Sequence, residues 1–109
     1  MKFSDGFWLN QRGFNVNYAV MAYEITTTPN SITVFATSSA IYNRAMTLGG
    51  VTFEITYKST APDVIKVSVV HHKGTLKNAP KFELNEDQGY IPEIKTGEDF
   101  AEMTSGSTK

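Results

Sequence analysis

The fold is decided by the stretch Val51-Thr52-Phe53-Glu54-Ile55-Thr56-Tyr57-Lys58. Its apolar side chains fall at every second position, which is typical of a strand with one buried face. A second alternating run follows, with Ile65, Val67, Val69 and His71 on one face. Between the two runs lie Ser59-Thr60-Ala61-Pro62-Asp63, and five polar or turn-forming residues in this place predict an antiparallel hairpin.

An earlier part of the chain predicts a second hairpin, formed by residues 14–27 and 32–37. Apolar and polar side chains alternate over 14–20, which indicates a strand. The alternation breaks at 21–23, and either a β-bulge or a strand buried on both faces would explain the break. Thr28-Pro29-Asn30-Ser31 has the composition of a turn. Residues 44–48 are expected to link the two hairpins.

The C-terminal part of the chain has a weaker pattern. Residues 90–95 are compatible with a short edge strand, because Pro92 cannot donate to a ladder. Residues 97–103 fit either a short helix or a strand, and Ser105-Gly106 has the composition of a turn. Together the patterns predict an all-β fold, an antiparallel β-sandwich or a portion of one, with residues 1–109 as a single domain or fragment.

The composition supports strands and excludes several classes of protein. Valine and isoleucine number 15 against four leucines, and 13 threonines add further β-branched side chains, which pack well in sheets. The absence of cysteine excludes a disulfide scaffold, a cysteine nucleophile and a thiolate zinc site. No apolar run approaches the roughly 20 residues of a membrane helix, so no membrane partner is expected. A net charge of −1 argues against binding to nucleic acid.

The charges are distributed unevenly along the chain. Residues 1–82 carry eight basic and four acidic side chains, whereas 83–109 carry seven acidic and two basic ones. Residues 83–109 therefore form an acidic C-terminal arm, either a solvated connecting segment or an arm that docks on a basic surface. The N-terminus has no apolar stretch of the length that an export signal needs, and we expect a cytoplasmic protein.

A search for catalytic chemistry finds no constellation that fits a known mechanism. His71 and His72 are the only histidines, and neighbours on a strand point to opposite faces, so they cannot grip one metal ion together. We expect His71 to be a hydrogen-bonded residue at the rim of the apolar face. The sequence has no phosphate-binding glycine loop and no nucleophile elbow. It therefore predicts no catalytic residue, no metal and no cofactor.

An aromatic cluster near the N-terminus is a candidate carbohydrate contact. Phe7 and Trp8 lie beside Asp5, and an aromatic ring can cover the C–H face of a sugar while a carboxylate takes its hydroxyls. The alternative is that these rings anchor the N-terminal strand in the core, which is the commoner role of large aromatic side chains.

Three blocks of the sequence resemble bacterial α-xylosidases of glycoside hydrolase family 31. The first is Met1-Lys2-Phe3-Ser4-Asp5-Gly6-Phe7-Trp8-Leu9, which is similar to the start of those enzymes. The second is Val64-Ile65-Lys66-Val67-Ser68-Val69, which leads into His71 or His72 and then Lys73-Gly74. The third is Pro80-Lys81-Phe82-Glu83-Leu84-Asn85. The blocks occur in the same order and cover nearly the whole chain.

The resemblance implies an N-terminal β-sandwich of the galactose mutarotase type, followed in the relatives by a (β/α)₈ barrel. The barrel of those enzymes supplies the two catalytic aspartates of a retaining mechanism. A barrel of this kind needs roughly 250 residues, so 109 residues cannot contain it. The resemblance therefore implies a non-catalytic domain that packs on the catalytic barrel, shapes its entrance and is inactive alone.

Two other functions fit the same residues. One is a stand-alone carbohydrate-binding β-sandwich that uses Trp8 as its platform, and the other is a mutarotase-like epimerase, which the opposed histidines make the weakest of the three. In the relatives, the block that resembles residues 99–106 is a strand that leads through a turn to a partner strand, and that partner is missing here. The resemblance therefore implies an exposed sheet edge, and we expect a homo-oligomer formed through that edge.

Overall fold

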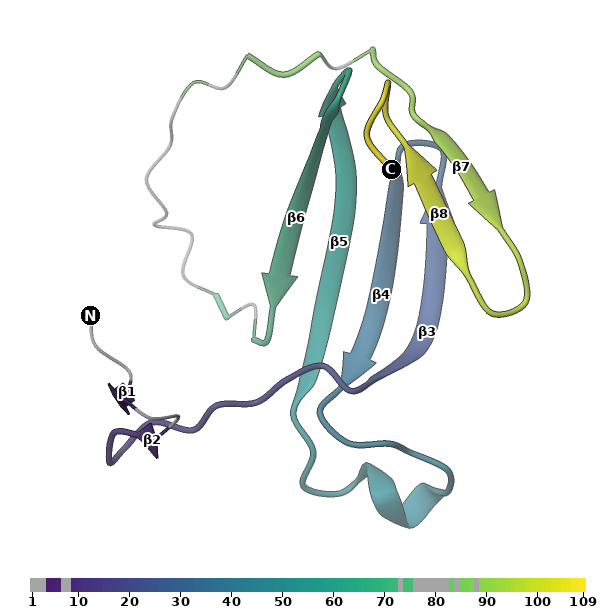
Figure 1. Cartoon of the computed structure of the whole chain (residues 1–109). Coiled ribbons are helices and arrows are strands. Elements are labelled where there is room, and N and C mark those ends of the chain that lie inside the picture. The colour runs from purple at the N-terminus through teal and green to yellow at the C-terminus, as the bar shows by residue number, and fades with distance from the viewer. Residues whose placement is uncertain (1–3, 7–8, 73, 76–82, 84, 88) are drawn as a thin grey trace.

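The computed structural model describes residues 4–6, 9–72, 74–75, 83, 85–87 and 89–109. Within those residues the chain forms strands and one 3₁₀ turn, and it contains no α-helix (Figure 1). The strands are β1 (Ser4–Gly6), β2 (Leu9–Asn10), β3 (Met21–Thr28), β4 (Ser31–Thr37), β5 (Thr52–Ala61), β6 (Val64–Val70), β7 (Glu93–Thr96) and β8 (Ala101–Thr104), and the 3₁₀ turn η1 is Arg44–Thr47. All pairings are antiparallel, which confirms the predicted all-β class.

The central feature is a four-stranded meander in the order β3-β4-β5-β6. The predicted hairpin is its second half, in which Tyr57 pairs with Val67 and Ile55 with Val69. The predicted five-residue turn is too long, because β5 continues to Ala61 and the connection is Pro62-Asp63 alone. A register irregularity between Ser59 and Ala61 takes up the extra residue, as a β-bulge does.

The first hairpin of the meander joins β3 and β4 through Pro29-Asn30. Of the two explanations for the broken alternation at 21–23, the structure shows the β-bulge, because the register shifts between Ala22 and Glu24. The predicted strand over 14–20 is wrong. β4 ends at Thr37, opposite Met21, because the chain turns away at Ser38 and leaves no neighbour for a longer ladder.

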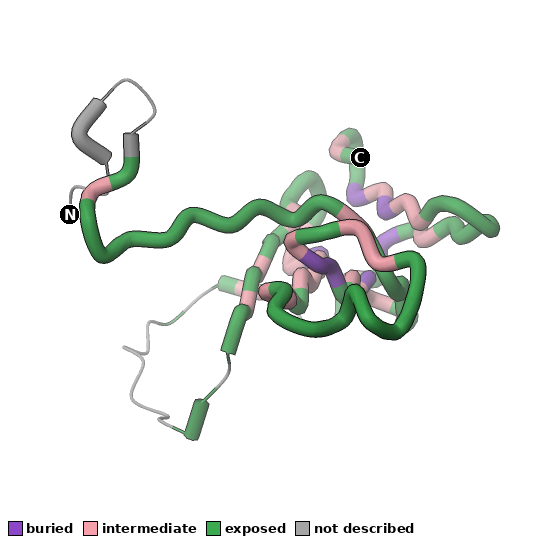
Figure 2. The backbone as a smooth tube through the Cα atoms, turned by 90° about the horizontal axis from the view of Figure 1, so that it is seen from below, coloured by how far each residue is buried: buried purple, intermediate pink, exposed green. Residues whose placement is uncertain are grey.

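Residues 11–20 instead form an extended tether between β2 and β3, and Figure 2 shows it as a long exposed segment. The backbone N–H of Val20 still donates to the Thr37 carbonyl at 2.8 Å. Tyr18 and Val20 are 74% and 63% exposed. Residues 14–20 therefore alternate between apolar and polar side chains without belonging to a strand.

A second, two-stranded layer is formed by β7 and β8, which cross one face of the meander near β3 and β4 (Figure 1). Residues 97–103 are a turn followed by a strand, and the turn is closed by a hydrogen bond from the Gly97 N–H to the Phe100 carbonyl at 2.8 Å. The expectation of an unpaired last strand is wrong, because Met103 pairs with Ile94 and Thr104 with Glu93. The acidic stretch thus contains a folded hairpin.

The face of the meander that lies under this hairpin is its inner face. Directly opposed residues of a sheet share a face, so the register defines its members. They are Ile25, Ile32, Val34, Ala36, Phe53, Ile55, Tyr57, Val67 and Val69. The hydrophobic core itself is small: Ile32, Ala36 and Met103 are the described hydrophobic residues that are buried.

The total surface shows how incomplete the packing is. The chain exposes 9133 Å², whereas a folded monomer of 12.1 kDa exposes about 6000 Å². Its radius of gyration is 16.9 Å, against about 13 Å for a compact domain of this length. Residues of the tether and of the open inner face are among the exposed ones.

Candidate functional site

The predicted carbohydrate contact lies at an end of the chain that is described only in part. Phe7 and Trp8 lie outside the described residues, and Asp5 belongs to β1, which pairs with β2. Figure 1 places this small hairpin away from the four-stranded sheet, at the far end of the tether. Sugar binding by these three residues remains a prediction.

The two histidines do not form a site. His71 Nδ1 lies 3.2 Å from the Thr52 carbonyl oxygen, which only accepts, so this bond requires the proton on Nδ1. The imidazole ring also lies 6.2 Å from the ring of Phe53. His71 is therefore the hydrogen-bonded rim residue that the sequence predicts, at the open end of the inner face.

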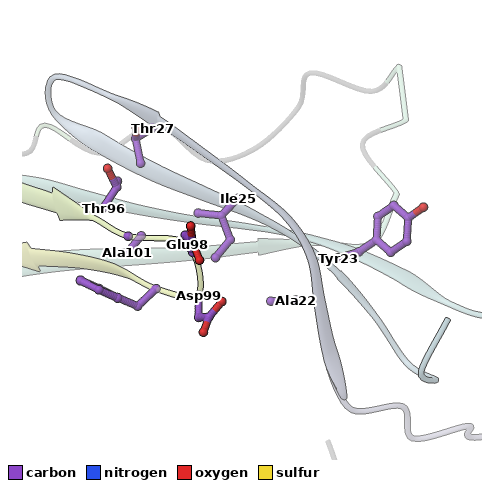
Figure 3. A pocket seen from close by; sticks show the side chains of 10 residues that line it. Ala22, Tyr23, Ile25, Thr27, Thr96, Glu98, Asp99 and Ala101 are labelled. Atoms are coloured by element: carbon purple, nitrogen blue, oxygen red, sulfur yellow. The ribbon is translucent and has the colours of Figure 1, made fainter. Parts of the chain in front are cut away.

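A first hollow lies between β3 and the turn that joins β7 to β8 (Figure 3). Its lining residues are Ala22, Tyr23, Ile25, Thr27, Thr96, Gly97, Glu98, Asp99, Phe100 and Ala101. Ile25 and Ala101 face each other there, whereas the Tyr23 side chain points away to the other side of β3 (Figure 3).

This hollow brings two carboxylates together without the other parts of an active site. Glu98 and Asp99 are neighbours in one tight turn, and no histidine lines the hollow with them. Among the described residues no three histidine or carboxylate side chains come together as a metal site would require. The carboxylates are therefore best explained as polar residues of an exposed turn.

The inner face is the larger candidate site, and the second layer covers only part of it. Met103 of β8 packs over Ile32, and these side chains are 6% and 5% exposed. On β6, by contrast, Val67 and Val69 are 53% and 60% exposed. A second hollow opens between β8 and this uncovered strip, and it is lined mostly by apolar side chains. Its lining residues are Ile25, Ile32, Val34, Tyr57, Ile65, Val67, Ala101, Met103, Thr108 and Lys109.

Such a surface can bind apolar side chains, and Tyr57, Thr108 and Lys109 add polar groups to its lining. Contiguous apolar area of this kind, with polar residues around it, is typical of an interface between packed layers or proteins. The inner face is therefore a candidate packing surface.

A buried serine pair joins the second layer to the meander. The hydroxyl oxygens of Ser59 and Ser105 lie 2.8 Å apart, and the residues are 2% and 0% exposed. Both hydroxyls also lie within hydrogen-bond distance of the Ala61 carbonyl, at 3.1 and 3.0 Å. The bulge in β5 and the end of β8 are thus joined by a satisfied polar network, which restricts their relative position.

Asp63 holds the turn that follows β8. Its carboxylate oxygen Oδ1 accepts hydrogen bonds from the Ser107 N–H and, at 2.8 Å, from the Ser107 hydroxyl. The Asp63 carbonyl accepts from the Thr108 hydroxyl at 3.1 Å. The Ser107 N–H and then the Ser107 hydroxyl lower the pKa of the Asp63 carboxyl below its usual 3.8, since both bonds favour the charged form.

Sequence reasoning missed this Asp63 contact because it joins residues 44 positions apart. The positive φ of 64° at Asp63 is common for Asp in a tight turn, and Pro62-Asp63 does indicate a turn. Nothing in either local pattern says that the two turns meet.

The fold and the sequence comparison both agree with a β module of a larger α-xylosidase-like protein as the class that this chain resembles. The chain forms antiparallel β layers with an open inner face, and the whole length of this chain matches part of an α-xylosidase. The matched protein is alpha-xylosidase XylQ of Lactiplantibacillus pentosus, 31% identical over 109 residues, which are 100% of this chain and 14% of that protein. The match confirms the resemblance to bacterial α-xylosidases that the sequence predicts. The chain spans about one seventh of the relative's length.

A scan against models of known protein families finds no match to this chain. Within the described residues, no helix is long and apolar enough to span a membrane.

Proposed function

We propose that this chain acts as a non-catalytic β module of an α-glycosidase of the α-xylosidase type. In this role it packs on the catalytic barrel of the complete enzyme and shapes the entrance to its active site, while the barrel supplies the carboxylates that hydrolyse the glycosidic bond. By itself the chain is inactive.

The uncovered inner face is the observation that carries this proposal. Val67 and Val69 are more than half exposed on a face that is buried at Ile32 and Ala36, and an isolated domain of this size would be expected to bury such side chains. The similarity to a segment of a much longer α-xylosidase supplies the polypeptide that would cover them.

A complementation experiment tests the proposal. The alpha-xylosidase XylQ is produced without the segment that this chain matches, and the 109-residue chain is added to it. Hydrolysis of an aryl α-xyloside is then measured for the truncated enzyme, for the chain alone and for the mixture. We expect activity only in the mixture, and a mixture as inactive as its parts would refute the proposal.

Two neighbouring residues of β6 provide a matched pair of variants. Val69 lies on the inner face, whereas Val70 pairs with Glu54 and lies on the opposite face. Val69→Lys is expected to abolish complementation, because it buries a charge in the interface. Val70→Lys is expected to leave complementation unchanged, since that face is not proposed to pack.

The remaining parts of the proposal concern location and contacts. We place the protein in the cytoplasm, because a cysteine-free chain has no need of an oxidising compartment.

Contact with carbohydrate through Asp5, Phe7 and Trp8 is weak or indirect in this role, and a sugar titration followed by Trp8 fluorescence tests it. Self-association of the isolated chain through its open C-terminal layer is tested by sedimentation.

A further inference from the structure

We propose that a hollow on the outer face of the meander, lined by Tyr23, Tyr42 and Arg44, is a binding site for a short neutral saccharide. The outer face is the side of the four-stranded sheet opposite the inner face. Packing of the inner face on another domain therefore leaves this site open, and the inference does not depend on the proposed function. The site is also separate from the predicted carbohydrate contact near the N-terminus.

The β-bulge in β3 places the first aromatic ring of the site. Ala22 pairs with Ala36 and Glu24 with Phe35, so Tyr23 is the extra residue of the bulge. The Tyr23 side chain points away from the hollow on the inner side, as a bulge can redirect it (Figure 3). Its ring meets the ring of Phe35 edge to face, with 6.4 Å between the centroids and 74° between the planes. Phe35 thus orients Tyr23 without covering it, since Tyr23 is 53% exposed.

The second wall of the hollow is the loop between β4 and β5, which contains η1. The lining residues are Tyr23, Ile41, Tyr42, Asn43, Arg44 and Thr47. The hollow has a volume of about 320 Å³, at the lower end of the roughly 300–1,000 Å³ of small-molecule sites. Tyr42 is 80% exposed, so two accessible aromatic rings from different elements border one small hollow. Such rings can cover the C–H face of a sugar.

The loop is held in place by its own hydrogen bonds. Its ends are joined by bonds from the Ser38 N–H to the Val51 carbonyl at 2.9 Å and from the Val51 N–H to the Ser38 hydroxyl at 3.0 Å. Around η1, Asn43 Oδ1 accepts from the Met46 N–H at 3.2 Å, and the Thr47 hydroxyl donates to the carbonyl three residues earlier at 2.7 Å. A preformed loop lowers the entropy cost of binding a ligand.

Polar groups of both kinds lie close to the two rings. Arg44 forms no ion pair with a described carboxylate, so its guanidinium can donate to a ligand. On the sheet, Glu24 and Glu54 lie opposite Phe35 on its two neighbouring strands, and both are exposed. Sugar hydroxyls donate and accept, so they suit this mixture of donors and acceptors. The two carboxylates disfavour an anionic ligand, so the site fits a neutral saccharide best.

The experiment is a titration of the isotopically labelled chain with saccharides, followed by the NMR shifts of its backbone amides. The neutral probes are xylobiose and maltotriose, and the anionic probe is glucuronic acid. We expect a neutral saccharide to shift the amides of residues 22–24 and 41–47 and to leave those of β6 unchanged. Since no charge pairing contributes, the Kd should change by less than about twofold between roughly 0.05 and 0.5 M NaCl.

Two similarly exposed tyrosines provide a matched pair of variants. Tyr42→Ala removes a ring that lines the hollow, and we expect it to weaken saccharide binding by about tenfold or more. Tyr18→Ala removes a ring of the tether that is 74% exposed and does not line the hollow, so binding should be unchanged. Arg44→Gln keeps amide donors without the charge and should weaken binding less than Tyr42→Ala does. The Tm of each variant checks that its fold is intact.

Three results would overturn the proposal. They are no shifts at residues 22–24 and 41–47 with either neutral saccharide, shifts there with glucuronic acid alone, and equal weakening by Tyr42→Ala and Tyr18→Ala. These measurements involve neither the inner face nor the enzyme, so their failure is distinguishable from a failure of complementation.

Discussion

The Asp63 contact joins two turns, and the conformation of each turn depends on a single residue. Gly106 has a φ of +60°, and a Cβ at this position would overlap the Asp63 carboxylate. Asp63 itself lies in the left-handed region with a φ of 64°. Each turn thus has a conformation that suits only a few residue types, and the two conformations meet at one hydrogen-bonded contact.

Gly106→Ala is expected to release the C-terminal turn. The left-handed conformation alone costs an alanine about 1–2 kcal/mol, and the overlap with Asp63 adds to that cost. Gly49→Ala is the matched control, because Gly49 has a φ of +81° and no atom within 4 Å of its Cβ position. Urea unfolding should show a larger loss for Gly106→Ala than for Gly49→Ala, and equal losses would contradict the contact.

The lowered pKa of Asp63 predicts a specific pH dependence. The folded-state pKa lies below 3.8, so the ionised carboxylate stabilises the fold above that pH, and this contribution is lost as the pH falls through the folded value. Asp63→Asn tolerates the same backbone conformation but cannot titrate. The Tm difference between wild type and Asp63→Asn should be larger at pH 7 than below pH 3, and a constant difference would argue against the effect.

At the scale of elements, the β7–β8 hairpin is held by few side chains. Met103 is the buried hydrophobic residue that it contributes to the core among the described residues. Met103→Ala should cost about 2 kcal/mol, the low end for a core methionine, because one side of its pocket is already open. Thr104→Ala on the same strand should cost much less, and urea midpoints measure both.

A strand could be predicted from the sequence where an alternating segment also has a neighbouring segment to pair with. Residues 51–58 and 64–70 alternate and find each other through a short turn, so local sequence was sufficient. Residues 14–20 alternate equally well but lie outside the ladder, because β4 leaves the sheet at Thr37. Pairing is a property of two segments, and the pattern of one segment cannot reveal that its neighbour has ended.

The candidate site was harder to predict than the strands. The sequence identifies which side chains share the inner face, including Val67 and Val69, but not which of them the second layer covers. That depends on where the β7–β8 hairpin crosses the meander, which is set by the Ser59–Ser105 and Asp63–Ser107 contacts. Both contacts join residues more than 40 positions apart, so no local sequence pattern predicts them.

At the scale of the whole molecule, the open face should make the isolated chain associate. A net charge of −1 gives little repulsion between copies, and kosmotropic salts strengthen the burial of apolar area. The association measured by sedimentation should therefore increase with sulfate. Replacing Val69 by Thr should weaken it, whereas Val70→Thr on the opposite face should not. Association that is insensitive to both changes would exclude the inner face as its cause.

The exposed tether also offers a way to dissect the molecule with a protease. Residues 11–20 lie outside any strand between β2 and β3, so a protease recognition sequence inserted between Asn15 and Asn17 should be cut in the folded protein. The cut would release the segment that carries Phe7 and Trp8 from the part that carries the meander and the second layer. Sugar binding and complementation of the enzyme could then be assigned to separate fragments of one purified chain.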